Sequence, residues 1–170
     1  MTLQHPQRGQ QWLETLLPLA GFGATVGLEQ PQIEAEFGYW LTIQSADLTA
    51  EQVDRLLGSG AAALDAIQYL INATLNIGQD REQQAVYTVE LANHRLNRYK
   101  ELRSLAEQAA SQVRQTQAEF VTQALSAAER RMVHTILQDE PDLETFSRGQ
   151  EPDRRLVVRL QLAEALPTED

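Results

Sequence analysis

Apolar residues recur along the first part of the chain with two different periods. Spacings of three or four predict amphipathic helices, as in residues 9–20, where Trp12, Leu16 and Leu19 share one face. Alternate spacing predicts strands, as in AVYTVEL at residues 85–91. The predicted elements, in order, are a helix over 9–20, strands over 24–29 and 37–44, helices over about 50–57 and 61–76, a strand over 85–91 and a helix over about 92–115. This order predicts an α+β domain in which helices cover one face of a three-stranded sheet.

Capping motifs mark where two helices begin. Thr49 and Gln52 form a capping box, in which side chains and backbone N–H groups bond reciprocally. Gly58 ends the short helix that starts there. Ser126 and Glu129 form a second capping box, which predicts the start of a helix in the second part of the chain.

The second part of the chain predicts a smaller α+β unit. Its predicted elements are a short strand over 119–125, a helix over 126–139 and a strand over 156–162, with a polar tail after it. The pattern turns polar at residues 115–118. We therefore expect one domain over 1–116 and a second over 117–170.

Composition narrows the classes of function. Hydrophobic residues make up 42% of the 170 residues, enough for packed cores, and no cysteine is present to form a disulfide or a thiolate metal site. No apolar stretch approaches the roughly 18 residues of a membrane helix. The apolar segment near the start is interrupted by Pro18 and carries Glu14, which is atypical of a signal peptide. We therefore expect a cytoplasmic protein without membrane contact.

Charge is distributed unevenly along the chain. The net charge of -10 argues against indiscriminate binding to nucleic acid. Residues 1–80 contain two basic and nine acidic residues, whereas residues 121–170 contain six arginines. Because the planar fork of arginine fits phosphate, any anion-binding surface is expected in the second half.

Two segments resemble the domains of one bacterial protein family. The stretch ALDAIQYLIN, followed by a strand and a helix with YKELRSLAEQAA, resembles the KH domain of the Jag-like (KhpB) RNA-binding proteins. The stretch ALSAAERRMVHTILQD, followed by SRGQEPDRRLVV, resembles their R-three-H domain, which is named for an arginine and a histidine separated by three residues. Arg130 and His134 form this pair. The family's separate N-terminal Jag domain is not expected, because the KH pattern starts close to Met1.

The resemblance implies a KH domain over 1–116 and a small R-three-H domain over 117–170. It also implies binding to single-stranded RNA. A homodimer, or a heterodimer with a second KH protein, is the further partner that it suggests. No cofactor is expected.

The KH resemblance points to one loop in particular. KH domains hold the nucleic-acid backbone with a GXXG loop between two helices. The four aligned positions are Gly58, Ser59, Gly60 and Ala61, so the second glycine is missing and the loop contains no cation. Three interpretations arise: a silent loop that preserves the fold, a weak RNA clamp through backbone N–H groups, and a dinucleotide-binding loop. The last needs a preceding buried strand, whereas AEQVDRLL predicts a capped helix, so we set it aside.

The main candidate contacts to phosphate lie in the predicted R-three-H domain. They are Arg130, Arg131, His134, Ser147, Arg148, Gly149, Arg154 and Arg155. Converging arginines would form a forked surface that matches phosphate. The alternative is a hydrated face whose arginines pair with Glu129, Glu151 and Asp153. His134 could instead be structural and hold Arg130 or the loop that follows.

Other side chains are less specific candidates. They are the basic face of the long predicted helix and three aromatic residues: Arg95, Arg98, Lys100, Arg103, Tyr39, Trp40 and Tyr69. A basic helix face is more often a hydrated surface, whereas aromatic rings can stack bases. The three histidines are too scattered for a metal site, and no activated nucleophile or P-loop lysine indicates an enzyme.

We interpret the sequence as a non-catalytic single-stranded RNA-binding protein. Arginines of the second domain are expected to contact phosphates. The KH domain, with its degenerate loop, is expected to serve mainly as a scaffold or interface. The alternative is a protein–protein adaptor that docks a partner through its acidic KH surface, with little or no RNA binding.

Overall fold

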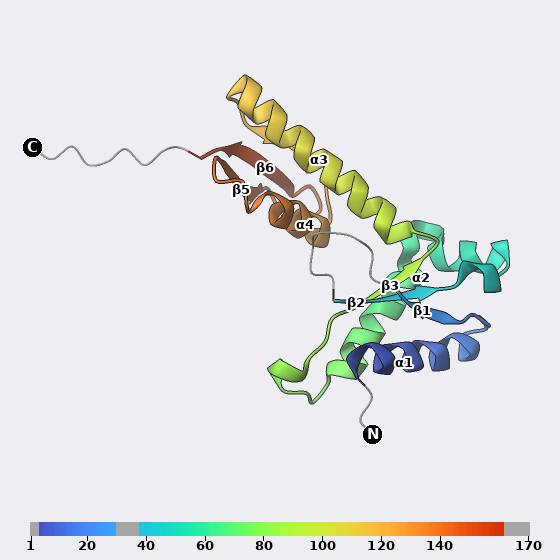
Figure 1. Ribbon diagram of the computed structural model, residues 1–170. Helices are drawn as coiled ribbons and strands as arrows, with labels where there is room; N and C mark the ends of the chain where they lie inside the picture. Colours follow the sequence, from blue (N-terminus) through green and yellow to red (C-terminus); the bar gives the residue numbers. More distant parts are fainter. Residues whose placement is uncertain (1–3, 30–37, 162–170) are drawn as a thin grey trace, which may run out of the picture. The chain divides into compact units, whose positions relative to one another are not determined.

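The computed structural model describes residues 4–29 and 38–161, and the chain divides into two compact units (Figure 1). The first unit is Met1–Asn97 and the second is Arg98–Asp170. Each has its own sheet and its own apolar core, so each is described separately. The polar tail that the sequence predicts lies outside the described residues. No helix in the two described ranges is long and apolar enough to cross a membrane.

The first unit contains a three-stranded sheet and the predicted helices. Its elements are α1 (His5–Leu19), β1 (Val26–Leu28), β2 (Tyr39–Ile43), the short helix η1 (Ser45–Asp47), α2 (Ala50–Asn76), η2 (Arg81–Gln83), β3 (Tyr87–Leu91) and the start of α3 (His94–Thr116). The strand order is β1-β2-β3, with β2 antiparallel to β1 and parallel to β3. The α+β class is confirmed, and the order of elements is compatible with a KH domain.

The core of the first unit lies between its sheet and two helices. Leu41 and Ile43 of β2 and Val89 of β3 share a cluster with Leu13 of α1 and Ile71 of α2. All are at most 1% exposed. Because full burial of such a side chain stabilises a fold by about 1.5–3 kcal/mol, this cluster anchors α1 and α2 to the sheet.

Side-chain amides of α2 cover the free edge of β3 and of the residues just before it. Asn72 accepts a hydrogen bond from the Tyr87 N–H (2.9 Å) and donates one to the Tyr87 carbonyl (2.7 Å). One helical turn later, Asn76 forms the same pair of bonds with the backbone of Ala85, both at 2.8 Å. The amides therefore take the place of the neighbouring strand that an edge strand lacks.

The helix α2 is interrupted at the predicted loop. Gly58 is extended (φ -60°, ψ 159°), and the next three residues have positive φ angles of 51°, 72° and 61°. Ser59 and Gly60 are exposed, whereas Ala61 is 1% exposed and packs into the core. The prediction of two helices joined by a short loop is confirmed.

The second unit combines most of α3 with a second sheet. After α3 come β4 (Phe120–Val121), α4 (Ala127–Leu137), β5 (Leu143–Arg148) and β6 (Arg155–Leu160). The sheet is antiparallel with the order β4-β6-β5. The sequence analysis did not predict β5. Thr145 and Ser147 lie opposite apolar core residues of β6 but are polar themselves. The alternation of apolar and polar residues that marks a strand is therefore weak in β5.

The buried face of α3 belongs to the second core. Leu102, Ala106 and Val113 lie in the same cluster as Val133 of α4, and each is at most 1% exposed. The second compact unit accordingly begins at Arg98, whereas the sequence analysis placed the boundary at residues 115–118. The polar residues at 115–118 mark the end of α3. The second core begins earlier, within α3 at Leu102.

We predict that Asn72→Ala lowers the free energy of unfolding by about 1–3 kcal/mol, because both backbone groups of Tyr87 lose their partner. Urea denaturation followed by far-UV circular dichroism measures this change. Asn97→Ala is the matched control, since Asn97 is exposed on α3 and alanine is the better helix former. Equal effects of the two substitutions would contradict the role given to the amides.

Candidate nucleic-acid interface

The second capping box sets the start of α4. The Ser126 hydroxyl accepts a hydrogen bond from the Glu129 N–H (3.3 Å), and the Glu129 carboxylate accepts one from the Ser126 N–H (2.7 Å). Arg98 of α3 donates to the other Glu129 oxygen at 2.7 Å. These bonds fix the turn of α4 that carries Arg130 and Arg131.

The same bonds lower the pKa of Glu129. Burial acts in the opposite direction and raises it. The hydrogen bonds from Ser126 and Arg98, together with the charge of Arg98, outweigh that penalty and hold the pKa below its ordinary value of 4.5. The ionised carboxylate is therefore the form that the fold stabilises.

Arg130 lies inside the second unit. Its side chain is 5% exposed. The guanidinium donates to the carbonyl oxygens of Leu125 and Arg154 and forms an ion pair with Glu151. The expectation that Arg130 faces phosphate does not fit this burial, because its donors are directed at protein acceptors. Arg130 instead ties α4 to the loop between β5 and β6.

His134 lies one turn further along α4 and is exposed. Its Nδ1 forms a hydrogen bond with the Thr145 hydroxyl of β5. The alternative in which His134 holds neighbouring structure is thus supported, although its partner is Thr145 and not Arg130. Arg131, which follows Arg130 in the chain, is exposed.

The remaining candidates lie along β5, the following loop and β6. Ser147 is opposite Leu156, on the side of the sheet that faces the core. Gly149 has a φ of 93°, a conformation that favours glycine, at the turn after β5. Arg148 and Arg155 are cross-strand neighbours, so their side chains project from the same face of the sheet.

The arginines of this unit differ in whether they are paired. Arg148 forms an ion pair with Glu119 at 2.9 Å. Within the described part of the chain, Arg131, Arg154 and Arg155 are exposed and have no ion pair. These three arginines are called the unpaired arginines below.

The basic face of α3 is largely neutralised. Arg98 contacts Glu101 and Glu129, and Arg103 pairs with Glu107 at 3.0 Å. In the first unit, Arg95 at the start of α3 pairs with an aspartate at 2.7 Å. The interpretation of this face as a hydrated, ion-paired surface is favoured.

The loop at the α2 interruption contains no cation of its own. The closest arginine in sequence, Arg55, pairs with Glu51 at 2.5 Å. Among the aromatic candidates of this unit, Trp40 is 6% exposed and Tyr69 is 72% exposed. The ring of Tyr39 stacks on His5, with centroids 6.0 Å apart. Of these three aromatic rings, Tyr69 is therefore the most accessible to a ligand.

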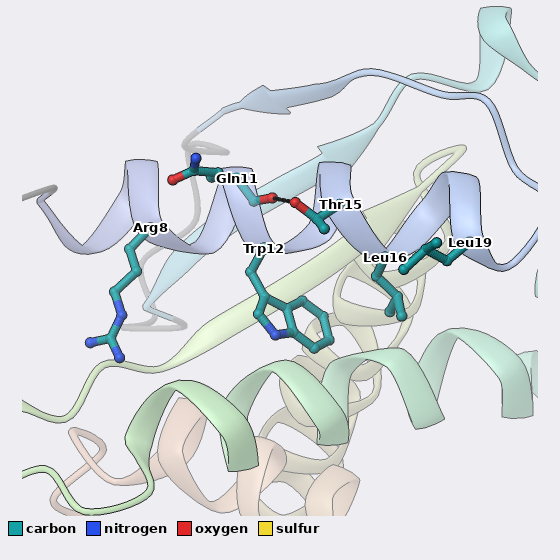
Figure 2. Close-up of a pocket in the computed structure, with 6 residues that line it drawn as sticks. All are labelled: Arg8, Gln11, Trp12, Thr15, Leu16 and Leu19. Carbon is teal, nitrogen blue, oxygen red and sulfur yellow. Dashed lines mark hydrogen bonds between the residues drawn. The ribbon is translucent and has the colours of Figure 1, made fainter.

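A pocket of about 420 Å³ lies along α1 (Figure 2). Trp12, Leu16 and Leu19, the face predicted to be apolar, line it together with Arg8. Leu19 is 83% exposed, so this face is only partly buried and the centre of the core lies one residue further round the helix. The pocket contains no pair of groups suited to acid–base catalysis. Within the described ranges, no cluster of histidines and carboxylates could hold a metal ion.

Sequence reasoning missed Phe146 and Arg159. Both lie on the face of the second sheet that carries Arg148, and Arg159 is opposite Glu144. Their signal was hidden because β5 was not predicted, so the pairing of β5 with β6 could not be inferred.

We predict that Arg130→Lys lowers the free energy of unfolding of the second unit by about 1–3 kcal/mol, because one ammonium cannot reach all three acceptors. Hydrogen exchange at the amides of β6 measures it. Arg131→Lys, one residue away and exposed, is the control, and we expect a change within about 0.5 kcal/mol. A similar effect of both substitutions would argue against the buried role.

We predict that Glu129 contributes to acid unfolding. The pKa of Glu129 is lower in the folded chain than in the unfolded chain. The stabilisation by Glu129 is therefore complete above about pH 4.5 and is lost as the pH falls through the folded-state pKa. Glu129→Gln should therefore reduce the loss of unfolding free energy as the pH falls below the ordinary pKa of a glutamate, about 4.5. Asp139→Asn, at an exposed position, is the control. An unchanged pH profile for Glu129→Gln would refute the assignment.

Comparison with known proteins agrees with this description. Residues 100–160 match the R-three-H domain family, so the match starts within α3, close to where the second compact unit begins. The chain is 24% identical over 151 residues to the RNA-binding protein KhpB of Clostridium symbiosum, covering 89% of this chain and 64% of that protein. It is 26% identical over 129 residues to the RNA-binding protein KhpB of Lactiplantibacillus plantarum, covering 76% and 39%.

The chain thus spans less than two thirds of the length of either of these relatives. Its second unit carries the Arg130 and His134 pair within the matched residues. On these comparisons together, residues 100–160 match the R-three-H domain family, and the chain is similar to KhpB proteins over most of its length.

Proposed function

We propose that this chain binds single-stranded RNA and catalyses no reaction on it. Two similar proteins are named as RNA-binding proteins. Affinity for nucleic acid comes mainly from Lys and Arg contacts to phosphate, so the location of available cations decides which unit binds.

The unpaired arginines carry the proposal. Arg131 follows Arg130 on α4, and the backbone carbonyl of Arg154 accepts a hydrogen bond from the buried Arg130 guanidinium at 3.2 Å. Arg155 begins β6. Because a helix, a loop and a strand already hold the backbone of these arginines, only their side chains need to be ordered on binding. Their N–H donors are not engaged by carboxylates of the described residues, so they can form bidentate contacts to phosphate.

The first unit serves mainly as a scaffold or interface in this proposal. Ser59 and Gly60 are exposed in the interruption of α2, so their backbone could approach an anion. However, the nearest arginine in sequence is engaged with Glu51. A loop of this kind supplies little of the salt-dependent attraction on which RNA binding depends.

Docking of a protein partner is a second candidate function of the first unit. Two apolar residues of α2 are exposed, Tyr69 at 72% and Leu70 at 44%. Ile77, the residue that caps the end of α2, is 79% exposed. Contiguous exposed apolar patches are typical of interaction surfaces, and Tyr69 and Leu70 are adjacent residues of α2. A second copy of the chain or another KH protein is the partner that we consider here.

We predict that the double substitution Arg131→Gln and Arg154→Gln weakens RNA binding roughly tenfold or more, since each loses a charge-assisted contact. The slope of log Kd against log salt should fall by about 1.4, the value for two phosphates on a single strand. Fluorescence anisotropy with a labelled, unstructured RNA of mixed sequence measures both.

Arg81→Gln is the matched control, because Arg81 is exposed in the first unit and has no ion pair to a described residue. We expect its Kd to stay close to that of the wild type. An equal loss for the control would mean that binding depends on total charge alone. No binding by the wild type, with a dimer mass in solution, would instead favour the docking function.

A further inference from the structure

One face of the second sheet points away from the apolar core. Leu156 and Val158 of β6 lie in the core, so the residues that alternate with them project to the opposite side. The register places Phe146 opposite Val157 and Arg148 opposite Arg155 on that side. The outer sheet face, as we call it, consists of Val121, Glu144, Phe146, Arg148, Arg155, Val157 and Arg159, of which Val157 is fully buried.

Two guanidinium groups lie over the ring of Phe146. The Cζ atom of Arg159 is 4.9 Å from the ring centroid and that of Arg148 is 5.3 Å away. Glu144 accepts a hydrogen bond from Arg159 at 2.9 Å, and Glu119 accepts one from Arg148, also at 2.9 Å. The carboxylates and the ring together hold both guanidinium planes in place.

These groups remain accessible. The side chains of Arg148 and Arg159 are 54% and 40% exposed. Arg155, one of the unpaired arginines, is also exposed. With Glu119 and Glu144 as its carboxylates, the surface has one more arginine than acidic side chain, in a chain whose net charge is -10.

The chemistry of this face favours nucleic acid over an apolar protein partner. In the described part of the second unit, Val121 is the single large hydrophobic residue that is exposed, at 45%. Aromatic rings and guanidinium planes both stack on bases, and neither requires a particular base sequence. Phe146 is only partly exposed and lies under the two guanidinium groups, so the exposed planes that match a strand of unpaired bases are those of Arg148 and Arg159.

We propose that the outer sheet face is a base-stacking platform for single-stranded RNA, with the guanidinium planes of Arg148 and Arg159, which lie over Phe146, as the stacking surface. Arg155 contacts a neighbouring phosphate. The platform rests on the proposed RNA-binding function and adds to it. The unpaired arginines supply electrostatic attraction, and the platform supplies contacts to bases that a phosphate chain without bases cannot form.

Phe146→Leu tests the platform in the full chain, because leucine keeps an apolar side chain and removes the ring. We expect the Kd for an unstructured RNA to rise about fivefold or more, because the guanidinium planes lose the ring over which they are held for stacking. The affinity for inorganic polyphosphate, an anion without bases, should stay within twofold of the wild type, about 0.4 kcal/mol. Phe22→Leu, the same change in the first unit, is the control and should alter neither affinity.

A second variant separates the loss of stacking from a folding defect caused by Phe146→Leu. Arg159→Gln removes one stacking plane and leaves the ring, and it should weaken RNA binding more than polyphosphate binding. If the wild type binds RNA and both variants bind it with an unchanged Kd, the platform is refuted and the proposed function stands. If RNA and polyphosphate weaken equally, the face acts through charge and stacking is refuted. If the wild type binds no RNA, both proposals fall.

Discussion

One buried guanidinium connects the parts of the second unit that the functional proposal depends on. Arg130 donates to the carbonyl oxygens of Leu125 and Arg154 and pairs with Glu151, so a single side chain links the start of α4, the loop after β5 and the start of β6. A buried arginine without such partners would be costly. The same arrangement commits Arg130 to structure and leaves its neighbours Arg131 and Arg154 facing solvent.

The two units use polar side chains for different purposes. In the first unit, Asn72 completes the backbone hydrogen bonding of Tyr87 in β3, and Asn76 does the same for Ala85 just before the strand, so this edge cannot pair with another strand. In the second unit, carboxylates such as Glu119 and Glu144 hold arginines against the sheet. The first unit therefore supplies a stable fold with few available cations, and the second supplies a cationic and aromatic surface.

The sequence predicted those features that depend on local patterns. Both capping boxes are present as expected, so the starts of α2 and α4 were predicted closely. β5 was missed because Thr145 and Ser147 stand at positions where an apolar residue would have marked the strand. The burial of Arg130 was not predictable, since its acceptors lie 5, 21 and 24 residues away and converge only in the folded unit.

The division of labour between the two units is the central claim, and backbone amide signals test it most directly. The isotope-labelled chain would be titrated with a short single-stranded RNA of mixed sequence. We expect shifts at Arg131, at Arg154 and along the outer sheet face, with the signals of residues 58–61 unchanged. Shifts confined to residues 58–61 would contradict it, because the loop without a cation would then be the RNA-binding site.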